Sequence, residues 1–236
     1  MTETEKAIDL NADLGEGFPW DEPLLERVTS ASICCGAHAG DPALIMRTLR
    51  AARERGVVVG AHPGYADRPS FGRRELALSS HEVERLVIEQ VQRLEKLAAL
   101  VGLELKFIKP HGALYNQAQF QEPIASGVIS ATRRLGLPVL GQPATHLESM
   151  ARREGLRFVP EGFADRRYLP DGRLVPRTDP RAILDDPEEA RAQVLRLVDA
   201  GIQTLCIHGD DPRAVALADR VRGMLDQAAI VRRSFV

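Results

Sequence analysis

Seven short apolar runs alternate along the chain with longer amphipathic stretches, and this alternation limits the possible folds more than any other feature. Short apolar runs are typical of strands buried on both faces, and the longer stretches can hold the helices that connect parallel strands. Because no break in composition interrupts the series, we expect one α/β domain over residues 1–236. The expected strands are Ala7–Leu10, Ala31–Cys35, Val57–Ala61, Leu105–Ile108, Pro138–Leu140, Leu156–Val159 and Thr204–Ile207.

Helix start signals stand between these strands. Asp41, Asp186 and Asp211 each precede a proline, which is the pattern of an acidic N-cap followed by proline at the first helical position. Ser79 and Thr145 are each followed three residues later by glutamate, which is the pattern of a capping box. We therefore expect a helix to begin at each of these five positions.

Two parallel architectures are compatible with this alternation, an open sheet and a closed barrel. An open nucleotide-binding sheet normally carries a Gly-x-Gly-x-x-Gly motif after its first strand or a Gly-x-x-x-x-Gly-Lys-Ser/Thr phosphate loop. Neither motif occurs at such a place in this chain. A barrel instead places polar residues at the carboxyl ends of many strands, which is the pattern observed, so we expect a (β/α) barrel.

The first expected strand leads into a series in which acids and an amide alternate with apolar residues. Asp9, Asn11 and Asp13 are spaced by two, so they share one face for as long as the chain stays extended. Three such groups at the mouth of a barrel would bind a cation or a polar ligand. A polar turn with an aspartate cap is the alternative.

The six histidines divide into two groups. His81 and His146 lie in expected helix starts, where a solvated or capping role is the better interpretation. The other four stand just past expected strands, and four histidines in equivalent places favour a common site. These four are His38, His62, His111 and His208.

Lys109 is one of only four lysines among the 31 basic residues, and it stands between an expected strand and Pro110. A compact, titratable charge suits binding of a carboxylate or phosphate, or stabilisation of an oxyanion. We expect substitution of Lys109 by Met to abolish activity and to leave the fold intact. In the polar loop over 161–177, Arg166 could clamp a carboxylate with two parallel hydrogen bonds, or it could pair with Asp165.

The charge balance and the absence of recognisable targeting signals narrow the range of partners and compartments that we expect. With 31 basic and 33 acidic residues the net charge is -2, which makes nucleic acid an unexpected partner. No apolar run reaches the ~20 residues that span a bilayer, and the N-terminus does not have the pattern of a signal peptide. With only three cysteines, Cys35 and Cys206 are interpreted as packing residues, and we expect a cytoplasmic protein that does not bind membranes.

Six stretches, in order and covering nearly the whole chain, resemble the LamB/YcsF family. A match in several segments is far more specific than any one motif. The resemblance implies an irregular (β/α) barrel of the glycoside hydrolase/deacetylase type. The matching stretches are IDLNADLGEG at 8–17, CGAHAGDP at 35–42, GAHPGYADRPSFGRRE at 60–75, IKPHGALYN at 108–116, EGFADRRYLPDGRLVPR at 161–177 and CIHGDDP at 206–212.

The resemblance also implies an activity, which is ATP-dependent ring opening of 5-oxo-L-proline to L-glutamate by a 5-oxoprolinase complex with two partner subunits, B and C. A lactam amide is a poor electrophile, so phosphorylation of its oxygen would make attack by water feasible. Because this chain has no phosphate loop, we expect the partner subunits to handle most of the ATP.

Such chemistry needs a carboxylate clamp, a stabiliser of the oxyanion or phosphate, and a general base. Lys109 and Arg166 could serve as clamp or stabiliser, and Asp13 or His111 as base. The expected catalytic residues are Asp13, Lys109, His111 and Asp165. The expected substrate-binding residues are Asp9, Asn11, His38, His62, Asn116, Arg166, His208 and Asp210.

Two other functions stay open. In a stand-alone metal-dependent deacetylase or amidohydrolase, Asp13, His38 and His62 would hold a divalent ion, and Asp165 or His111 would move protons. In a non-catalytic binding protein, the same residues would bind a carboxylated amide or a sugar. Zinc at near one equivalent would favour the first, and tight binding without turnover would favour the second.

Overall fold

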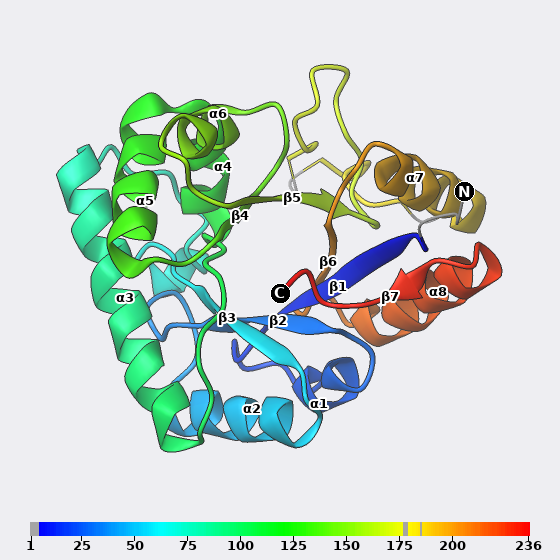
Figure 1. Ribbon diagram of the computed structural model, residues 1–236, viewed down its shortest axis with the longest axis horizontal. Helices are drawn as coiled ribbons and strands as arrows, with labels where there is room; N and C mark the ends of the chain where they lie inside the picture. The colour runs from blue at the N-terminus through cyan, green and yellow to red at the C-terminus, as the bar shows by residue number, and fades with distance from the viewer. Residues whose placement is uncertain (1–4, 177–178, 185) are drawn as a thin grey trace.

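The computed structural model describes residues 5–176, 179–184 and 186–236, so Arg177 of the loop singled out above lies outside the described residues. Its strands form one parallel sheet that curls on itself, with the helices around the outside (Figure 1). The strands are β1 (Ala7–Leu14), β2 (Ser30–Cys34), β3 (Val58–His62), β4 (Val139–Gly141), β5 (Phe158–Phe163), β6 (Thr204–His208) and β7 (Val231–Arg232).

The strand order is β3-β2-β1-β6-β5-β4, and the short β7 pairs with the start of β1. Residues 105–108 fill the space between β3 and β4. Ile108 forms parallel bridges to Ala61 of β3 and to Val139 of β4. The amide of Lys109 then donates to the carbonyl of Ala61 at 2.8 Å. This segment completes the ring, and the prediction of an irregular (β/α) barrel is confirmed.

Six of the seven expected strands form regular strands, and Leu105–Ile108 is the one that forms only bridges. Two strands run four residues past their expected ends, since β1 continues to Leu14 and β5 continues to Phe163. Both extensions carry polar side chains that turn into the barrel and find partners there, so polarity does not end the strand. Strand β7 was not expected from the sequence, because it is only two residues long.

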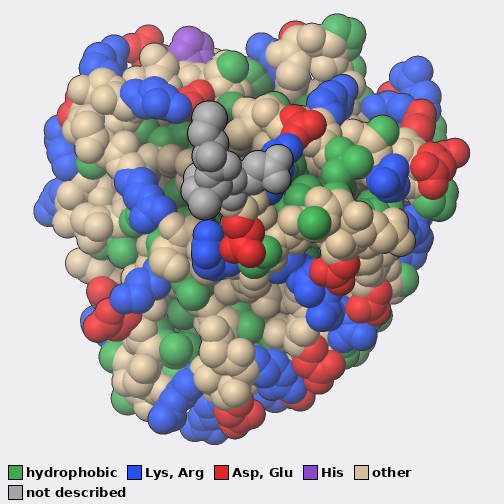
Figure 2. All heavy atoms as spheres, turned by 45° about the vertical axis from the view of Figure 1, so that its right-hand side comes forward, with side chains coloured by type: hydrophobic (Ala, Val, Ile, Leu, Met, Phe, Trp, Pro, Cys, Tyr) green, Lys and Arg blue, Asp and Glu red, His purple; other side chains and the backbone are tan. Residues whose placement is uncertain are grey.

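Helices connect successive strands and lie outside the ring (Figure 1). Of the described helices, none combines the length and the apolar character needed to cross a membrane. Acidic and basic side chains are interspersed on the face drawn in Figure 2. The helices are α1 (Asp21–Leu25), α2 (Pro42–Glu54), α3 (Ser80–Leu100), α4 (Gly112–Phe120), α5 (Glu122–Leu135), α6 (His146–Arg153), α7 (Pro187–Asp199) and α8 (Ala214–Gln227), with a 3₁₀ turn at Arg68–Ser70.

Four of the five expected helix starts are confirmed. In each, the cap side chain accepts a hydrogen bond from a backbone amide in the first turn. Asp211 is the exception, because α8 begins only at Ala214 and the Asp211 carboxylate instead accepts from the amide of Arg213 at 2.8 Å, within a turn. The four confirmed caps are Asp41, Ser79, Thr145 and Asp186.

The interior of the barrel differs between its two ends. At the amino ends of the strands, Phe107, Leu140 and Val159 form an apolar cluster. Phe235 of the C-terminal segment packs on it, with its ring 5.3 Å from that of Phe107, and the C-terminus lies near the middle of the ring (Figure 1). Polar side chains fill the interior toward the carboxyl ends, and the candidate site lies there.

Candidate functional site

The alternating polar residues of β1 all turn into the barrel. Asp9, Asn11 and Asp13 are buried, as their period of two requires for one face of a strand. The deepest is Asp9, which accepts hydrogen bonds from the hydroxyls of Thr29 at 2.6 Å and Thr204 at 2.5 Å. Burial raises the pKa of Asp9 to about 6. Asp9 therefore has a structural role in the interior beneath the site.

Lys109 reaches across the barrel from the end of the 105–108 segment and is 2% exposed. Its Nζ lies 2.8 Å from Asp13 Oδ1 and 2.8 Å from Glu161 Oε1. It also lies 3.1 Å from Asn11 Oδ1 and 2.9 Å from Cys206 Sγ. Burial alone would lower the pKa of Lys109, but the Asp13 carboxylate and the other acceptors hold it well above its usual value.

This arrangement changes the expectation that Met at position 109 would leave the fold intact. Burial opposes ionisation of Asp13, yet the Lys109 ammonium holds the Asp13 pKa below its usual value. Lys109 is thus the counter-charge of two buried carboxyl groups, those of Asp13 and Glu161. We therefore expect its removal to cost stability as well as activity.

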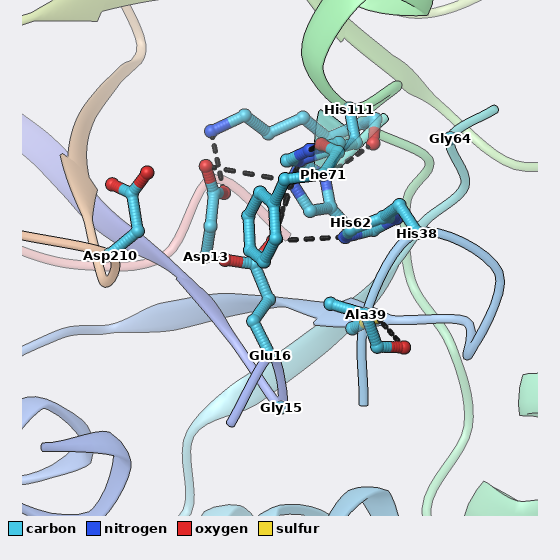
Figure 3. A network of polar contacts seen from close by, with 12 residues as sticks. Asp13, Gly15, Glu16, His38, Ala39, His62, Gly64, Phe71, His111 and Asp210 are labelled. Atoms are coloured by element: carbon cyan, nitrogen blue, oxygen red, sulfur yellow. Dashed lines mark hydrogen bonds and ion pairs between the residues drawn. The ribbon is translucent and has the colours of Figure 1, made fainter. Parts of the chain in front are cut away.

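Glu16 lies beside three histidine rings in the turn after β1 (Figure 3). Its Oε1 lies 3.0 Å from Nε2 of His38, 3.4 Å from Nδ1 of His111 and 3.9 Å from Nε2 of His62. Burial raises the pKa of Glu16 to about 8. Gly15 has a φ of 79°, a conformation that favours glycine, and it turns the chain so that Glu16 faces the rings.

The three rings pack against one another. His38 and His111 are stacked with centroids 3.7 Å apart and planes 3° apart, and His62 is nearly perpendicular to both. Burial lowers the pKa of His38 and of His111 to about 4, and that of His62 well below its usual value. A side chain at Gly64 would place its Cβ 2.9 Å from Nδ1 of His38, so this close packing requires glycine there.

Two of these rings are oriented by backbone carbonyls. Nδ1 of His62 lies 2.7 Å from the carbonyl oxygen of Lys109, and Nε2 of His111 lies 2.8 Å from that of Phe71. The remaining nitrogens, Nε2 of His62 and Nδ1 of His111, face each other at 3.0 Å. Nε2 of His62 is also 3.5 Å from Asp13 Oδ2.

A cavity of about 480 Å³ opens above these groups, a size suited to a small molecule. Four of the twelve residues expected in the site do not line it: Asp9 and Asn11 lie beneath its floor, His38 lies behind Glu16, and Asp165 lies behind the cavity wall. The eight that line it are Asp13, His62, Lys109, His111, Asn116, Arg166, His208 and Asp210.

The far wall of the cavity carries most of the remaining charge. Asp210 pairs with Arg73, and Nδ1 of His208 lies 3.6 Å from Oδ2 of Asp165. Arg166 is buried, lines the cavity and donates to the carbonyl of Val175 at 2.6 Å, so it is not the exposed surface residue that the alternative assumed. Asp165 does not line the cavity itself, but its contact with His208 links it to a side chain that does.

Two groups of metal-ligating side chains occur among the described residues. Glu16, His62 and His111 form one, and Asp13, Cys206 and His208 form the other. Neither is the expected set of Asp13, His38 and His62. Cys206, interpreted from the sequence as a packing residue, does pack in the interior but also contacts the Lys109 ammonium.

Sequence reasoning missed several charged residues of the site. Glu161 contacts Lys109, and four others line the cavity: Glu16, Arg73, Glu75 and Arg173. Glu161 would have been found if the strand before it had been extended, because Val159, Glu161 and Phe163 then alternate inward. No local signal marks Arg73, because its loop is brought to the cavity by tertiary structure.

Comparisons with known proteins agree on the family. A model of the LamB/YcsF family matches residues 8–236. A protein of Methylococcus capsulatus, named as the A subunit of 5-oxoprolinase, is 46% identical over 237 residues, covering 92% of this chain and 91% of that protein. The crystal structure of a lactam utilization protein from Thermus thermophilus has a TM-score of 0.89 at 40% identity, covering 97% of this chain and 100% of that one.

A more distant structure shares only the fold. The catalytic domain of a peptidoglycan N-acetylglucosamine deacetylase from Eubacterium rectale has a TM-score of 0.53 at 11% identity, covering 100% of this chain and 91% of that one. The expected likeness to deacetylase-type barrels is therefore confirmed at the level of architecture. At this identity the likeness says nothing of the reaction.

Proposed function

Because the chain belongs to the LamB/YcsF family, we propose that it is the A subunit of a 5-oxoprolinase, which hydrolyses the lactam of 5-oxo-L-proline to give L-glutamate. The relatives that bear this name cover nearly the whole chain. The observation that carries the proposal is the ammonium–carboxylate pair of Lys109 and Asp13, 2.8 Å apart at the floor of a cavity with arginines on its walls.

The substrate is a small ring with one carboxylate and one amide, and the cavity offers a group for each. Arg166 on the wall would clamp the carboxylate, since a guanidinium can make two parallel hydrogen bonds to it. Lys109 would stabilise the charge that develops on the lactam oxygen or on its phosphate. Asp13, held ionised by Lys109, would be the base that activates water, with His111 as the alternative.

The remaining expected residues take supporting roles in this proposal. Asp165 would orient His208, whose ring lines the cavity. Asn11 would hold Lys109 in place through its side-chain oxygen. Asn116, His62 and Asp210 would contact the substrate from the walls.

ATP enters the proposal as a co-substrate of the complex. Relatives named as the A subunit imply partner subunits, which we take to be subunits B and C. These would supply most of the nucleotide site. We place the complex in the cytoplasm, a compartment compatible with three buried, free thiols.

The test is reconstitution with 5-oxoproline and ATP, measuring glutamate and ADP. We expect turnover with all three subunits present and none with this chain alone. Robust turnover by the isolated chain would contradict the proposal. In the complex, Asp13→Asn should lower the rate at least about 100-fold, because a general base is lost while the shape is kept. Asp67→Asn, a buried acid outside the cavity, should leave the rate unchanged.

The same experiment separates the two other functions. Hydrolysis of an amide by the isolated chain without ATP would favour the stand-alone amidohydrolase, for which the convergence of Glu16, His62 and His111 is the supporting observation. Binding of 5-oxoproline without turnover, with all partners present, would favour a non-catalytic binding protein.

A further inference from the structure

The hydrogen-bond partners of His62 and His111 determine which ring nitrogens carry a hydrogen. A backbone carbonyl can only accept a hydrogen bond, so Nδ1 of His62 must carry a hydrogen toward Lys109 and Nε2 of His111 must carry one toward Phe71. In neutral rings, the opposite nitrogens are then bare lone pairs. These are the two atoms that lie 3.0 Å apart.

Two lone pairs at that distance repel each other unless something positive lies between or beside them. The Glu16 carboxyl points its Oε1 at the same spot from 3.4 and 3.9 Å. An ionised Glu16 carboxylate brings further negative density, and a protonated one has a single hydrogen to offer to two lone pairs. The Lys109 cation nearby is already engaged by Asp13 and Glu161. A positive charge at the centre of the cluster would therefore relieve the repulsion.

We propose that Glu16, His62 and His111 bind one divalent transition-metal ion of the zinc type, through Oε1, Nε2 and Nδ1 respectively. The donors are the imidazole nitrogens and carboxylate oxygen that such ions take. The carbonyls behind both rings are the outer partners that usually fix the tautomer of a metal-binding histidine.

The spacing of the three donor atoms fits such an ion. A tetrahedral ion with ligand distances of about 2.0–2.2 Å separates its ligands by roughly 3.3–3.6 Å. The three separations here are 3.0, 3.4 and 3.9 Å, which bracket that range. Small rotations of side chains would make them equal.

The fourth position would face the cavity. All three ligands line the cavity wall. Asp13 also lines the cavity, and its Oδ2 lies 3.5 Å from Nε2 of His62. Three protein ligands with one open position is the arrangement of catalytic ions, whereas structural zinc sites are closed by four protein ligands. A divalent ion bound here would supply a Lewis acid beside the Lys109–Asp13 pair.

The test is metal binding by the isolated chain, which makes it independent of substrate, ATP and partner subunits. Chelator-treated protein is titrated with Co²⁺, and binding is followed by the visible absorption of the ion and by metal analysis with Zn²⁺. We expect one equivalent, with a tetrahedral or five-coordinate Co²⁺ spectrum. Glu16→Gln, which keeps the shape of the side chain, and His111→Ala should each weaken binding at least about 10-fold.

His208→Ala is the matched control, because His208 lines the same cavity but belongs to the other donor group. It should bind Co²⁺ like the parent chain. Binding that is lost in His208→Ala and kept in Glu16→Gln would overturn the assignment, as would an absence of stoichiometric binding. Circular dichroism on each variant separates loss of the ion from loss of the fold, and failure here would leave the proposed lactam hydrolysis standing.

Discussion

Lys109 makes four polar side-chain contacts in the interior of the barrel. Its ammonium group lies between Asp13 and Glu161 at the floor of the cavity, and the side chain is almost fully buried. Removing one member of a buried ion pair is costly, because the charge that remains has lost both water and its partner. The same group thus stabilises the barrel and serves the proposed reaction.

We predict that Lys109→Met lowers the free energy of unfolding by about 3 kcal/mol. In the double variant Lys109→Met/Glu161→Gln the loss should be smaller, because one uncompensated carboxyl group is gone. Urea denaturation of the two single variants and the double variant measures the coupling. The exposed Lys96→Met serves as control and should unfold like the parent chain. Parent-like stability of Lys109→Met would show that Lys109 is not the counter-charge of these acids.

The sequence indicated that Lys109 belongs to the site, but it did not indicate that the side chain is almost fully buried. A rare lysine before a proline at a strand end signalled function. That it also neutralises Glu161 depends on the end of the 105–108 segment facing β5 across the barrel, which local sequence does not encode. For the same reason Asp9 was expected to bind substrate, although the structure places it beneath the floor of the cavity.

At the level of secondary-structure elements, helices α3 and α5 pack closely at Gly127. A Cβ at this position would lie 2.5 Å from the carbonyl oxygen of Ser80 and 2.6 Å from Cβ of Val83. Neither atom is the end of a flexible side chain, so neither can move aside cheaply. Glycine here allows the two helices to approach each other.

We predict that Gly127→Ala lowers the free energy of unfolding by about 1–3 kcal/mol, because overpacking outweighs the better helix propensity of alanine. Gly223 in α8 is the matched control, since its Cβ would meet nothing within 4 Å. Gly223→Ala should raise stability by up to about 1 kcal/mol. Thermal unfolding followed by circular dichroism compares the two, and a stabilising Gly127→Ala would contradict the predicted close contact.

Elements with a local signal were predictable, and their ends were less so. Caps such as Ser79 and Asp186 fix a helix start by bonding to nearby amides, so sequence alone locates it. Strand β1 continues to Leu14, because Asn11 and Asp13 are satisfied by residues distant in the sequence, Thr204 of β6 and Lys109. An apolar run marks where a buried strand starts, but only tertiary partners decide how far it continues.

For the molecule as a whole, the barrel depends on closure through residues 105–108. This segment is not a regular strand, yet its amides are bonded on both sides. Lys106 donates to Val59 and Ile108 donates to Pro138, each at 2.8 Å. The expectation of a strand at 105–108 was therefore close to the observed pairing. The expectation of a single domain over residues 1–236 stays a prediction.

We predict that the amides of Lys106, Ile108 and Lys109 exchange with deuterium as slowly as those of β2, which is paired on both sides. Slow exchange is expected because these amides open only when the ring opens. Hydrogen–deuterium exchange with peptide-level or NMR detection measures this. Exchange of the segment orders of magnitude faster than β2 would show that the ring is open between β3 and β4.

The polar column inside the barrel also has a consequence for heat capacity. Barrels of this type usually fill their axis with branched aliphatic side chains, whereas here carboxyl, amide and ammonium groups occupy the half nearest the cavity. On unfolding, newly wetted apolar surface raises the heat capacity and newly wetted polar surface lowers it. The chain should therefore gain less heat capacity than an equally long barrel with an aliphatic axis. Its stability would then change more gently with temperature, on the cold side of the maximum as well as on the warm side.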